Sequence, residues 1–266
     1  MKLDVVSDLH FEFLRESGFT RYCLPENPSE TLLIAGDIVA SFGRVNHLPS
    51  NLRAVWDRFW GEIVGAYSKV YLVLGNHDYR YSDFGRSNEE VKLLFENDKV
   101  KVLNNETVPL QDDLCLFGAT FWTHITDFRL KMLVQFQMND YNFIKVGDRL
   151  LSVDDVVAEN EKSFTKLLSE VTANSDKRFV VLSHHAPSLR SHNVERYGDS
   201  KIKFAYCNEY DAFLEEHPNV VAWIHGHDHE FHDYRIGNCH VFTNPFGYHQ
   251  GWDDEAKEFK IKTIEV

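Results

Sequence analysis

Short apolar runs recur along this chain, and each one ends abruptly in polar residues. The clearest run covers residues 70–74 and is followed directly by Gly75-Asn76-His77-Asp78. An apolar, β-branched run of this length, bounded by turn residues, predicts a strand that is buried on both faces. Four further runs have the same form, over residues 3–7, 31–35, 179–183 and 220–224.

Other segments show helical or weaker strand periodicity. Apolar residues at helical spacing predict amphipathic helices over residues 51–67 and 153–171 and shorter helices over 87–95 and 209–216. Short strands are predicted at 100–103, 114–118, 240–242 and 259–266. The alternation of strands with helices indicates βαβ units and therefore an α/β fold.

Two segments are predicted to lie near a functional site. Residues 188–203 form a polar loop that we expect at one rim of a pocket. Residues 121–148 mix aromatic residues with Met and Gln, and we expect them to form an insertion that contains a helix. We interpret residues 1–266 as a single domain around one site, because domains commonly reach about 250 residues.

Composition limits the classes of function. A hydrophobic share of 43% supports a large core, and no apolar run approaches the roughly 18 residues of a membrane span. No secretory signal is recognisable, and four scattered cysteines indicate reduced thiols, so we expect a cytoplasmic protein. A net charge of -13 argues against an extended nucleic-acid-binding surface, although bound divalent cations would still allow an anionic substrate to approach. The oligomeric state stays open.

The polar residues after the five strand-like runs are of the types that bind metal ions. Each fragment alone is weak, since Gly36-Asp37 is an ordinary turn pair and an Asp-x-His triplet is common in turns. Together they form one pattern, because polar groups at the carboxyl ends of such strands line a common crevice. Oxygen and imidazole donors without a thiolate suit Mn²⁺, Fe or Zn²⁺. The candidates are Asp8, His10, Asp37, Asn76, His184, His185, His227 and His229.

In chain order these fragments resemble the five motifs of the calcineurin-like metallophosphoesterase family. They read Asp8-x-His10, Gly36-Asp37, Gly75-Asn76-His77-Asp78, His184-His185 and Gly226-His227-x-His229. The resemblance covers residues 4–229 and is to small, stand-alone bacterial-type members. It implies a four-layer αββα sandwich, in which two mixed β-sheets are flanked by helices, with a dinuclear metal centre at one edge.

The resemblance also implies a role for each residue. Asp37 would bridge the two ions and His77 would lie over the scissile phosphate. One ion would be held by Asp8, His10 and His229, and the other by Asn76, His227 and one of His184 and His185. Because successive side chains leaving a strand point in opposite directions, only one of these two histidines should face the metals. We favour His184, the first after the strand.

This arrangement predicts a metal-dependent phosphoric ester hydrolase. Two divalent ions about 3.5–4 Å apart can generate a bridging hydroxide that attacks phosphorus in line. We expect Mn²⁺, with Fe or Zn²⁺ as alternatives. His77, oriented by its neighbour Asp78, would donate a hydrogen bond or a proton to the substrate; a purely structural histidine is the alternative.

Departures from the family pattern narrow the substrate class. Protein Ser/Thr phosphatases of this superfamily have Asp-Arg-Gly after the bridging aspartate and Glu after Asn-His, whereas this chain has Ile38-Val39-Ala40 and Asp78. These departures argue against a protein phosphatase. Because the resemblance is to small stand-alone members, it implies a phosphodiesterase acting on a small nucleotide-like substrate. A phosphomonoesterase and a catalytically silent metal-binding scaffold are the alternatives. Candidate substrate contacts, which could equally be ordinary loop residues, are Arg80, Tyr248 and His249.

Overall fold

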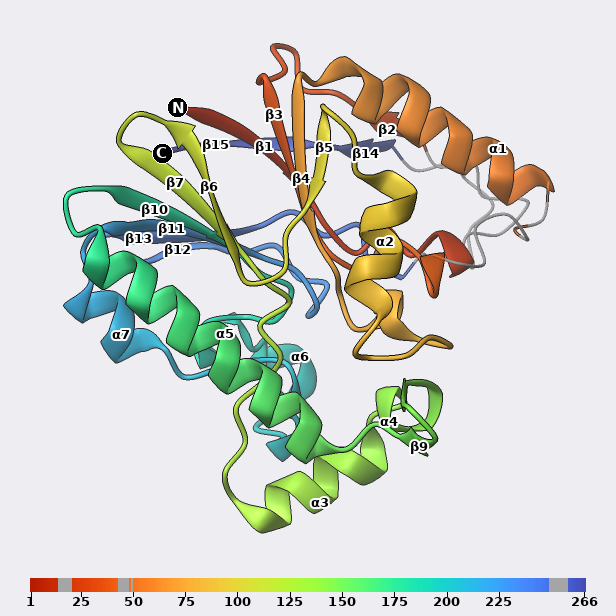
Figure 1. The fold of residues 1–266 in the computed structure, drawn as a ribbon, viewed down its shortest axis with the longest axis vertical. Helices are drawn as coiled ribbons and strands as arrows, with labels where there is room; N and C mark the ends of the chain where they lie inside the picture. Colours follow the sequence, from red (N-terminus) through yellow and green to blue (C-terminus); the bar gives the residue numbers. More distant parts are fainter. Residues whose placement is uncertain (14–20, 43–47, 49, 249–257) are drawn as a thin grey trace.

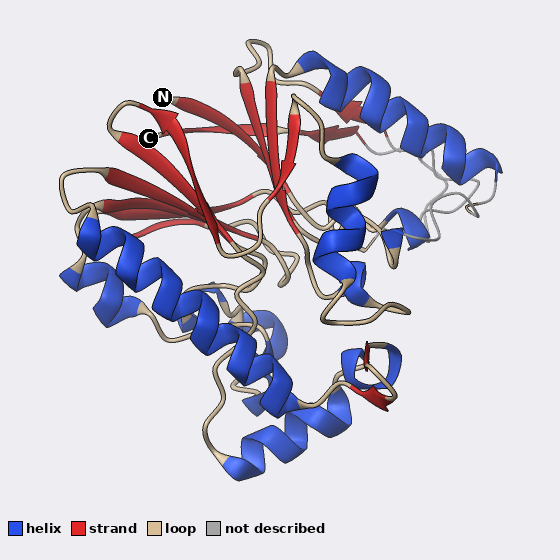
Figure 2. Cartoon of the chain, viewed as in Figure 1, coloured by secondary structure: helices blue, strands red, loops and turns tan. Residues whose placement is uncertain are grey.

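Two mixed β-sheets pack face to face, and helices cover the outer face of each sheet (Figures 1 and 2). The computed structural model describes residues 1–13, 21–42, 48, 50–248 and 258–266. The predicted four-layer αββα sandwich is confirmed. No helix within the described residues has the length and apolar character needed to cross a membrane.

The first sheet contains three of the strands predicted from the apolar runs. Its order is β15 (Lys262–Glu265), β1 (Lys2–Val6), β3 (Thr31–Ala35), β4 (Lys69–Val73) and β5 (Val100–Val102). β1, β3, β4 and β5 run parallel, whereas β15 pairs antiparallel with β1. Every residue of β3 is buried, as expected for a strand covered on both faces.

The second sheet contains the other two strands predicted from the apolar runs. Its order is β12 (Asp233–Ile236), β13 (Cys239–Thr243), β11 (Val220–His225), β10 (Arg178–Leu182), β7 (Leu114–Gly118) and β6 (Glu106–Gln111). The four inner strands are parallel and the two edge strands are antiparallel to their neighbours. Two minor sheets pair β2 (Arg21–Cys23) with β14 (Glu258–Lys260), and β8 (Lys145–Val146) with β9 (Arg149–Leu150).

Helices form the outer layers. In Figure 1, α1 (Ser50–Arg58) and α2 (Ser87–Phe95) lie beside the first sheet, and α5 (Val153–Ala173) and α7 (Asp211–Glu216) lie beside the second. α3 (Phe128–Gln137) and α4 (Asp140–Phe143) project at one end of the molecule (Figure 1). α6 (Val194–Tyr197) lies between short 3-10 turns at Leu189–Ser191 and Lys201–Ala205. Further 3-10 turns cover Phe11–Phe13 and His77–Tyr79.

Three apolar clusters match these layers. One lies between the sheets and includes Val5 and Leu33 from the first sheet with Val180 and Ile224 from the second. One of the other two joins the second sheet to α5 and α7, and the other joins the first sheet to α1 and α2 and extends to the beginning of α5. Burial of apolar surface stabilises folding by roughly 25 cal/mol per Å². The inter-sheet cluster therefore keeps the ends of both sets of strands together.

The structure corrects two predictions. The helix predicted over 51–67 ends at Arg58 and continues as a π-helical turn, Phe59–Ile63, and a 3-10 turn, Val64–Ala66. Gly61 and Gly65 lie in this stretch, and glycine weakens a regular helix. The segment 188–203 is a series of short helical turns rather than a plain loop. β6 and β12 were not predicted because edge strands lack a continuous apolar run.

Candidate metal centre

Loops that follow strands of both sheets converge at one end of the sandwich. In the first sheet, β1 leads to Asp8 and His10, β3 to Asp37 and β4 to Asn76. In the second sheet, β10 leads to His184, and β11 leads to His227 and His229. The site therefore combines the carboxyl ends of strands from two sheets, where parallel strands present their polar residues.

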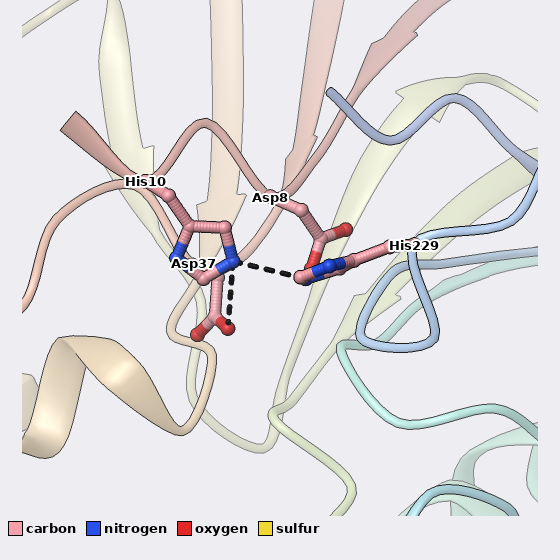
Figure 3. Close-up of side chains that lie close together, drawn as sticks. All are labelled: Asp8, His10, Asp37 and His229. Carbon is pink, nitrogen blue, oxygen red and sulfur yellow. Dashed lines mark hydrogen bonds and ion pairs between the residues drawn. The ribbon is translucent and has the colours of Figure 1, made fainter. Parts of the chain in front are cut away.

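The first group of ligand donors comprises Asp8, His10, Asp37 and His229, whose ligand atoms all lie within 4.8 Å of one another. Figure 3 shows these four side chains pointing toward one another from the loops after β1, β3 and β11. Nε2 of His10 lies 3.0 Å from Nε2 of His229 and 3.6 Å from Oδ2 of Asp37. Nε2 of His229 lies 3.4 Å from Oδ1 of Asp8. Two imidazoles and two carboxylates at this spacing suit Mn²⁺, Fe or Zn²⁺.

The second group comprises Asp37, His184 and His227, again within 4.8 Å. Nε2 of His184 lies 3.4 Å from Oδ2 of Asp37 and 3.0 Å from Oδ1 of Asn76. Nε2 of His227 is buried without a hydrogen-bond partner among the described residues. An unpaired buried polar atom costs about 1–3 kcal/mol, and a cation among these side chains would satisfy it. The donors present therefore fit two ions, and Asp37 belongs to both groups.

His184 and His185 have different surroundings in the structure. Nδ1 of His184 lies 2.8 Å from the carbonyl oxygen of Ala35, which can only accept, so Nδ1 carries a proton and Nε2 is directed at Asp37 and Asn76. The His185 ring packs against Trp122, with ring centroids 5.1 Å apart. Burial, together with the nearby His184, lowers the pKa of His185 to about 3. Burial alone would lower the pKa of His184, but the charge of Asp37 raises it to about 9. Only His184 belongs to the donor group.

Five of these residues have left-handed backbone conformations. φ is 54° at Asp8, 45° at His10, 53° at Asp37, 77° at His227 and 56° at His229. This region costs non-glycine residues of order 1–3 kcal/mol each and is enriched at functional sites. Backbone hydrogen bonds stabilise this conformation at two of the residues. The backbone N–H of Asp8 donates to the carbonyl oxygen of Gly36, and that of His10 donates to the carbonyl oxygen of Asp37, both at 3.0 Å.

The glycines next to these residues allow the loops to approach one another. A Cβ atom at Gly75 would lie 2.1 Å from Oδ1 of Asp37, and one at Gly226 would lie 2.5 Å from Oδ2 of Asp8. Both separations are far below van der Waals contact. Glycine at these two positions is therefore needed for the carboxylates to point into the centre.

Comparison with known proteins agrees with this geometry. The sequence profile described as calcineurin-like phosphoesterase matches residues 1–231. The chain belongs to the calcineurin-like phosphoesterase family. It is 26% identical over 269 residues to the uncharacterized protein L509 of Acanthamoeba polyphaga mimivirus, covering 92% of this chain and 91% of that protein. Family membership implies metal-dependent hydrolysis of phosphoric esters.

A solved structure shares the fold. The phosphopantetheinyl hydrolase PptH from Mycobacterium tuberculosis matches this phosphoesterase with a TM-score of 0.66 and 12% sequence identity. The match covers 99% of this chain and 95% of that one. At this identity the similarity supports a common architecture and does not transfer a substrate.

Asp78 does not orient His77 in this phosphoesterase, so that prediction is wrong. Oδ1 of Asp78 accepts the backbone N–H groups of Ile38 and Val39, each at 3.0 Å. Oδ2 accepts those of Asp37 at 2.9 Å and Gly75 at 2.8 Å. Asp78 therefore joins the loop after β3 to the loop after β4, and it holds the backbone of Asp37 in place.

The His77 ring has other partners. Nδ1 lies 2.9 Å from Oε1 of Glu12 and 3.1 Å from Nη1 of Arg80. Nε2 lies 3.1 Å from the hydroxyl of Tyr248. The backbone N–H of His77 donates to Oδ1 of Asp37 at 2.8 Å. His77 therefore lies beside the first donor group without belonging to it.

α4 contributes a buried carboxylate that sequence reasoning missed. Oδ1 of Asp140 accepts from Nε of Arg80 at 3.1 Å and from Nη2 at 2.9 Å. The side-chain amide of Asn76 donates to the same carboxylate. No pattern near Asp140 marks it in the sequence. Glu12 was also missed, although its place two residues after His10 is a weak signal.

A cavity of about 760 Å³ opens over the donor groups. Arg80 and Tyr248, two of the predicted substrate contacts, line it; the third, His249, lies outside the described residues. Residues 137–139 form part of one wall. The segment predicted as a rim also contributes, through residues that include His192, Arg196 and Tyr197.

Proposed function

We propose that this chain is a phosphodiesterase that uses two divalent metal ions to hydrolyse a small, nucleotide-like phosphate ester. The observation that carries the proposal is that two groups of ligand donors share Asp37 at a cavity of about 760 Å³. Cavities of roughly 300–1,000 Å³ accommodate small organic ligands. This volume therefore leaves room for an organic group on one or both sides of a phosphate.

The proposed ligand sets follow the two donor groups. One ion would be held by Asp8, His10 and His229, the other by Asn76, His184 and His227, and Asp37 would bridge them. We propose Mn²⁺ as the native ion, with Fe and Zn²⁺ as alternatives, because these donors suit all three. A bound pair of such ions supplies Lewis acidity and a nucleophile at neutral pH.

Three further side chains would act on the substrate directly. A His77 ring with protons on both nitrogens would keep its Nδ1–H on Glu12 while its Nε2–H faces the substrate. It would then donate to a phosphoryl or leaving-group oxygen. The Arg80 guanidinium would stabilise negative charge on the phosphate, and the Tyr248 hydroxyl, 3.1 Å from Nε2 of His77, would orient the ester.

Initial rates on two chromogenic esters test the proposal. With Mn²⁺-loaded protein, bis-p-nitrophenyl phosphate should be cleaved faster than p-nitrophenyl phosphate, and chelation should abolish both activities. His77→Ala should lower kcat by about 10²–10⁴-fold, the usual contribution of a positioned acid or base. Much faster cleavage of the monoester would favour a phosphomonoesterase. Hydrolysis of neither ester, with no effect of His77→Ala, would favour a silent metal-binding scaffold.

We infer that residues 1–266 act as one domain, in which residues 121–148 are an insertion that borders the substrate cavity. We also propose a cytoplasmic location, because the buried thiols of Cys115, Cys207 and Cys239 form no disulfide among the described residues. Small phosphate esters would be the partners, and the net charge of -13 argues against extended nucleic acids.

A further inference from the structure

Glu12 lies between a proposed metal ligand and the proposed substrate-facing histidine. Its Oε1 atom is 3.1 Å from Nδ1 of His10 and 2.9 Å from Nδ1 of His77. Its Oε2 atom accepts the backbone N–H of Ala40 at 3.0 Å. The side chain is 15% exposed. One carboxylate therefore receives three hydrogen bonds from three separate positions in the chain.

These contacts determine which ring nitrogens carry protons. A carboxylate can only accept hydrogen bonds, so Nδ1 of both rings must carry a proton. In His10 this leaves Nε2 free to face His229 and Asp37. In His77 it leaves Nε2 facing the Tyr248 hydroxyl and the cavity.

The residues that directly follow Asp37 offer no alternative acceptor for Nδ1 of His77. Ile38, Val39 and Ala40 have apolar side chains, and the carboxylate of Asp78 is engaged by four backbone N–H groups. Arg80 approaches Nδ1 of His77 to 3.1 Å, but a guanidinium is a donor and cannot accept the Nδ1 proton. Glu12 is thus the acceptor that the described residues provide for this ring.

We propose that Glu12 is a positioning residue, which fixes the rings of His10 and His77 through one oxygen, so that Nε2 of His10 faces the first donor group and Nε2 of His77 faces the cavity. The proposal rests on the proposed phosphoesterase function for its kinetic consequences. Removing a carboxylate that accepts the hydrogen bond from the outer N–H of a ligand histidine commonly lowers metal affinity or activity by 10–100-fold. Glu12 differs from that pattern in serving a ligand ring and a substrate-facing ring at once.

The first test is a double-mutant cycle on kcat. Glu12→Gln replaces one acceptor oxygen by a donor amide, so the three donors can no longer all be satisfied. We expect kcat to fall about 10–100-fold, with KM changed less than threefold. If Glu12 acts through His77, the same change in a His77→Ala background should lower kcat less than threefold. An equal loss in both backgrounds, or no loss in either, would overturn the proposal.

A second readout does not depend on turnover. In ¹⁵N-labelled protein, the His77 ring should show a protonated Nδ1, and Glu12→Gln should convert at least part of the population to the other tautomer or orientation. If the ¹⁵N chemical shifts of the His77 ring were the same in wild type and in Glu12→Gln, the positioning role would be contradicted. This result would hold whether or not the wild-type protein hydrolysed either ester. Absence of hydrolysis with the expected shifts would instead count against the proposed function alone.

The number of bound metal ions distinguishes a positioning role of Glu12 from direct ligation of a metal by Glu12. His10, Glu12 and His77 themselves offer three donor atoms within 4.8 Å. Calorimetric titration with Mn²⁺ should give two ions per chain in wild type and in Glu12→Gln, with weaker binding in the variant. A third ion lost only in Glu12→Gln would show that Glu12 is a ligand and would overturn the positioning role. Glu216→Gln, at an exposed position on α7, is the matched control and should equal wild type in every readout.

Discussion

The side-chain amide of Asn76 donates to both carboxylate oxygens of Asp140, at 3.0 Å and 2.9 Å. Because the amide nitrogen is occupied, Oδ1 of Asn76 points toward Nε2 of His184 and the second donor group. Asp140 is 4% exposed and also binds Arg80. One carboxylate from α4 therefore sets the orientation of a metal-ligand candidate and of a cavity-lining arginine.

Removal of this carboxylate should weaken metal binding. Asp140→Ala frees the Asn76 amide to rotate and leaves Arg80 without its partner. We expect Mn²⁺ affinity to fall about 10–100-fold, the usual effect of losing an outer hydrogen bond to a ligand, and kcat/KM to fall at least as much. Calorimetric titration and steady-state rates measure the two effects. Asp148→Asn, exposed in the same segment, should match wild type; equal affinity in both variants would contradict this role of Asp140.

His184 and His185 should behave differently when each is replaced by alanine. His184→Ala removes a donor that lies 3.4 Å from Asp37, so we expect one Mn²⁺ ion per chain instead of two, or at least 100-fold weaker binding. His185→Ala should retain two ions but lower the free energy of unfolding by about 2–4 kcal/mol, because a buried ring beside Trp122 is lost. Metal content after gel filtration tests the number of bound ions. Urea unfolding tests the loss of stability. Loss of an ion only in His185→Ala would reverse the assignment.

A methyl group at Gly75 should disable the centre. Gly75→Ala would bring a Cβ atom to 2.1 Å from Oδ1 and 2.5 Å from the backbone nitrogen of Asp37. Asp37 must move, so we expect activity to fall more than about 100-fold, as misplacement by 1 Å commonly does. Gly61→Ala is the control, since its Cβ would have no heavy atom within 4 Å. It should retain full activity, and stability should change by no more than about 1 kcal/mol. Full activity of Gly75→Ala would contradict the close approach.

The N-terminus of α5 should lose stability in acid. Arg149 pairs with Asp155 through two N–H groups at 2.6 and 2.7 Å, and Ser152 forms a capping box with the same carboxylate. The Arg149 hydrogen bond lowers the pKa of Asp155 from 3.8 to about 2. A carboxylate with a lowered folded-state pKa stabilises the fold above about pH 4, and this stabilisation disappears as pH falls toward 2.

Asp155→Asn measures that contribution. At pH 7 the variant should be less stable than wild type by about 1 kcal/mol, the usual value of a helix cap. The difference should shrink between pH 4 and pH 2, because wild type then protonates Asp155. Urea unfolding at several pH values provides the measurement, with Asp176→Asn at an exposed position as the control. A pH-independent difference would show that the charge of Asp155 is not responsible.

The sequence by itself determined the strands and most of the donor residues. Apolar runs at 3–7, 31–35, 70–74, 179–183 and 220–224 specify buried strands because burial depends on local composition. Motif order then identified Asp8, Asp37 and His227, since residues that directly follow such strands must lie at the same end of the fold. For these assignments it was sufficient that each residue follows closely after a predicted strand.

Only the tertiary structure decided how the donors are held. Glu12 meets His77 across 65 residues, and Asp140 meets Asn76 across 64. Asp78 was expected to hold its neighbour His77, yet its carboxylate turns to the backbone of the preceding strand-end loop. Local periodicity fixes which face of a strand is buried, whereas a side chain's partner depends on how separate loops pack. The packing of two sheets against each other supplied that information.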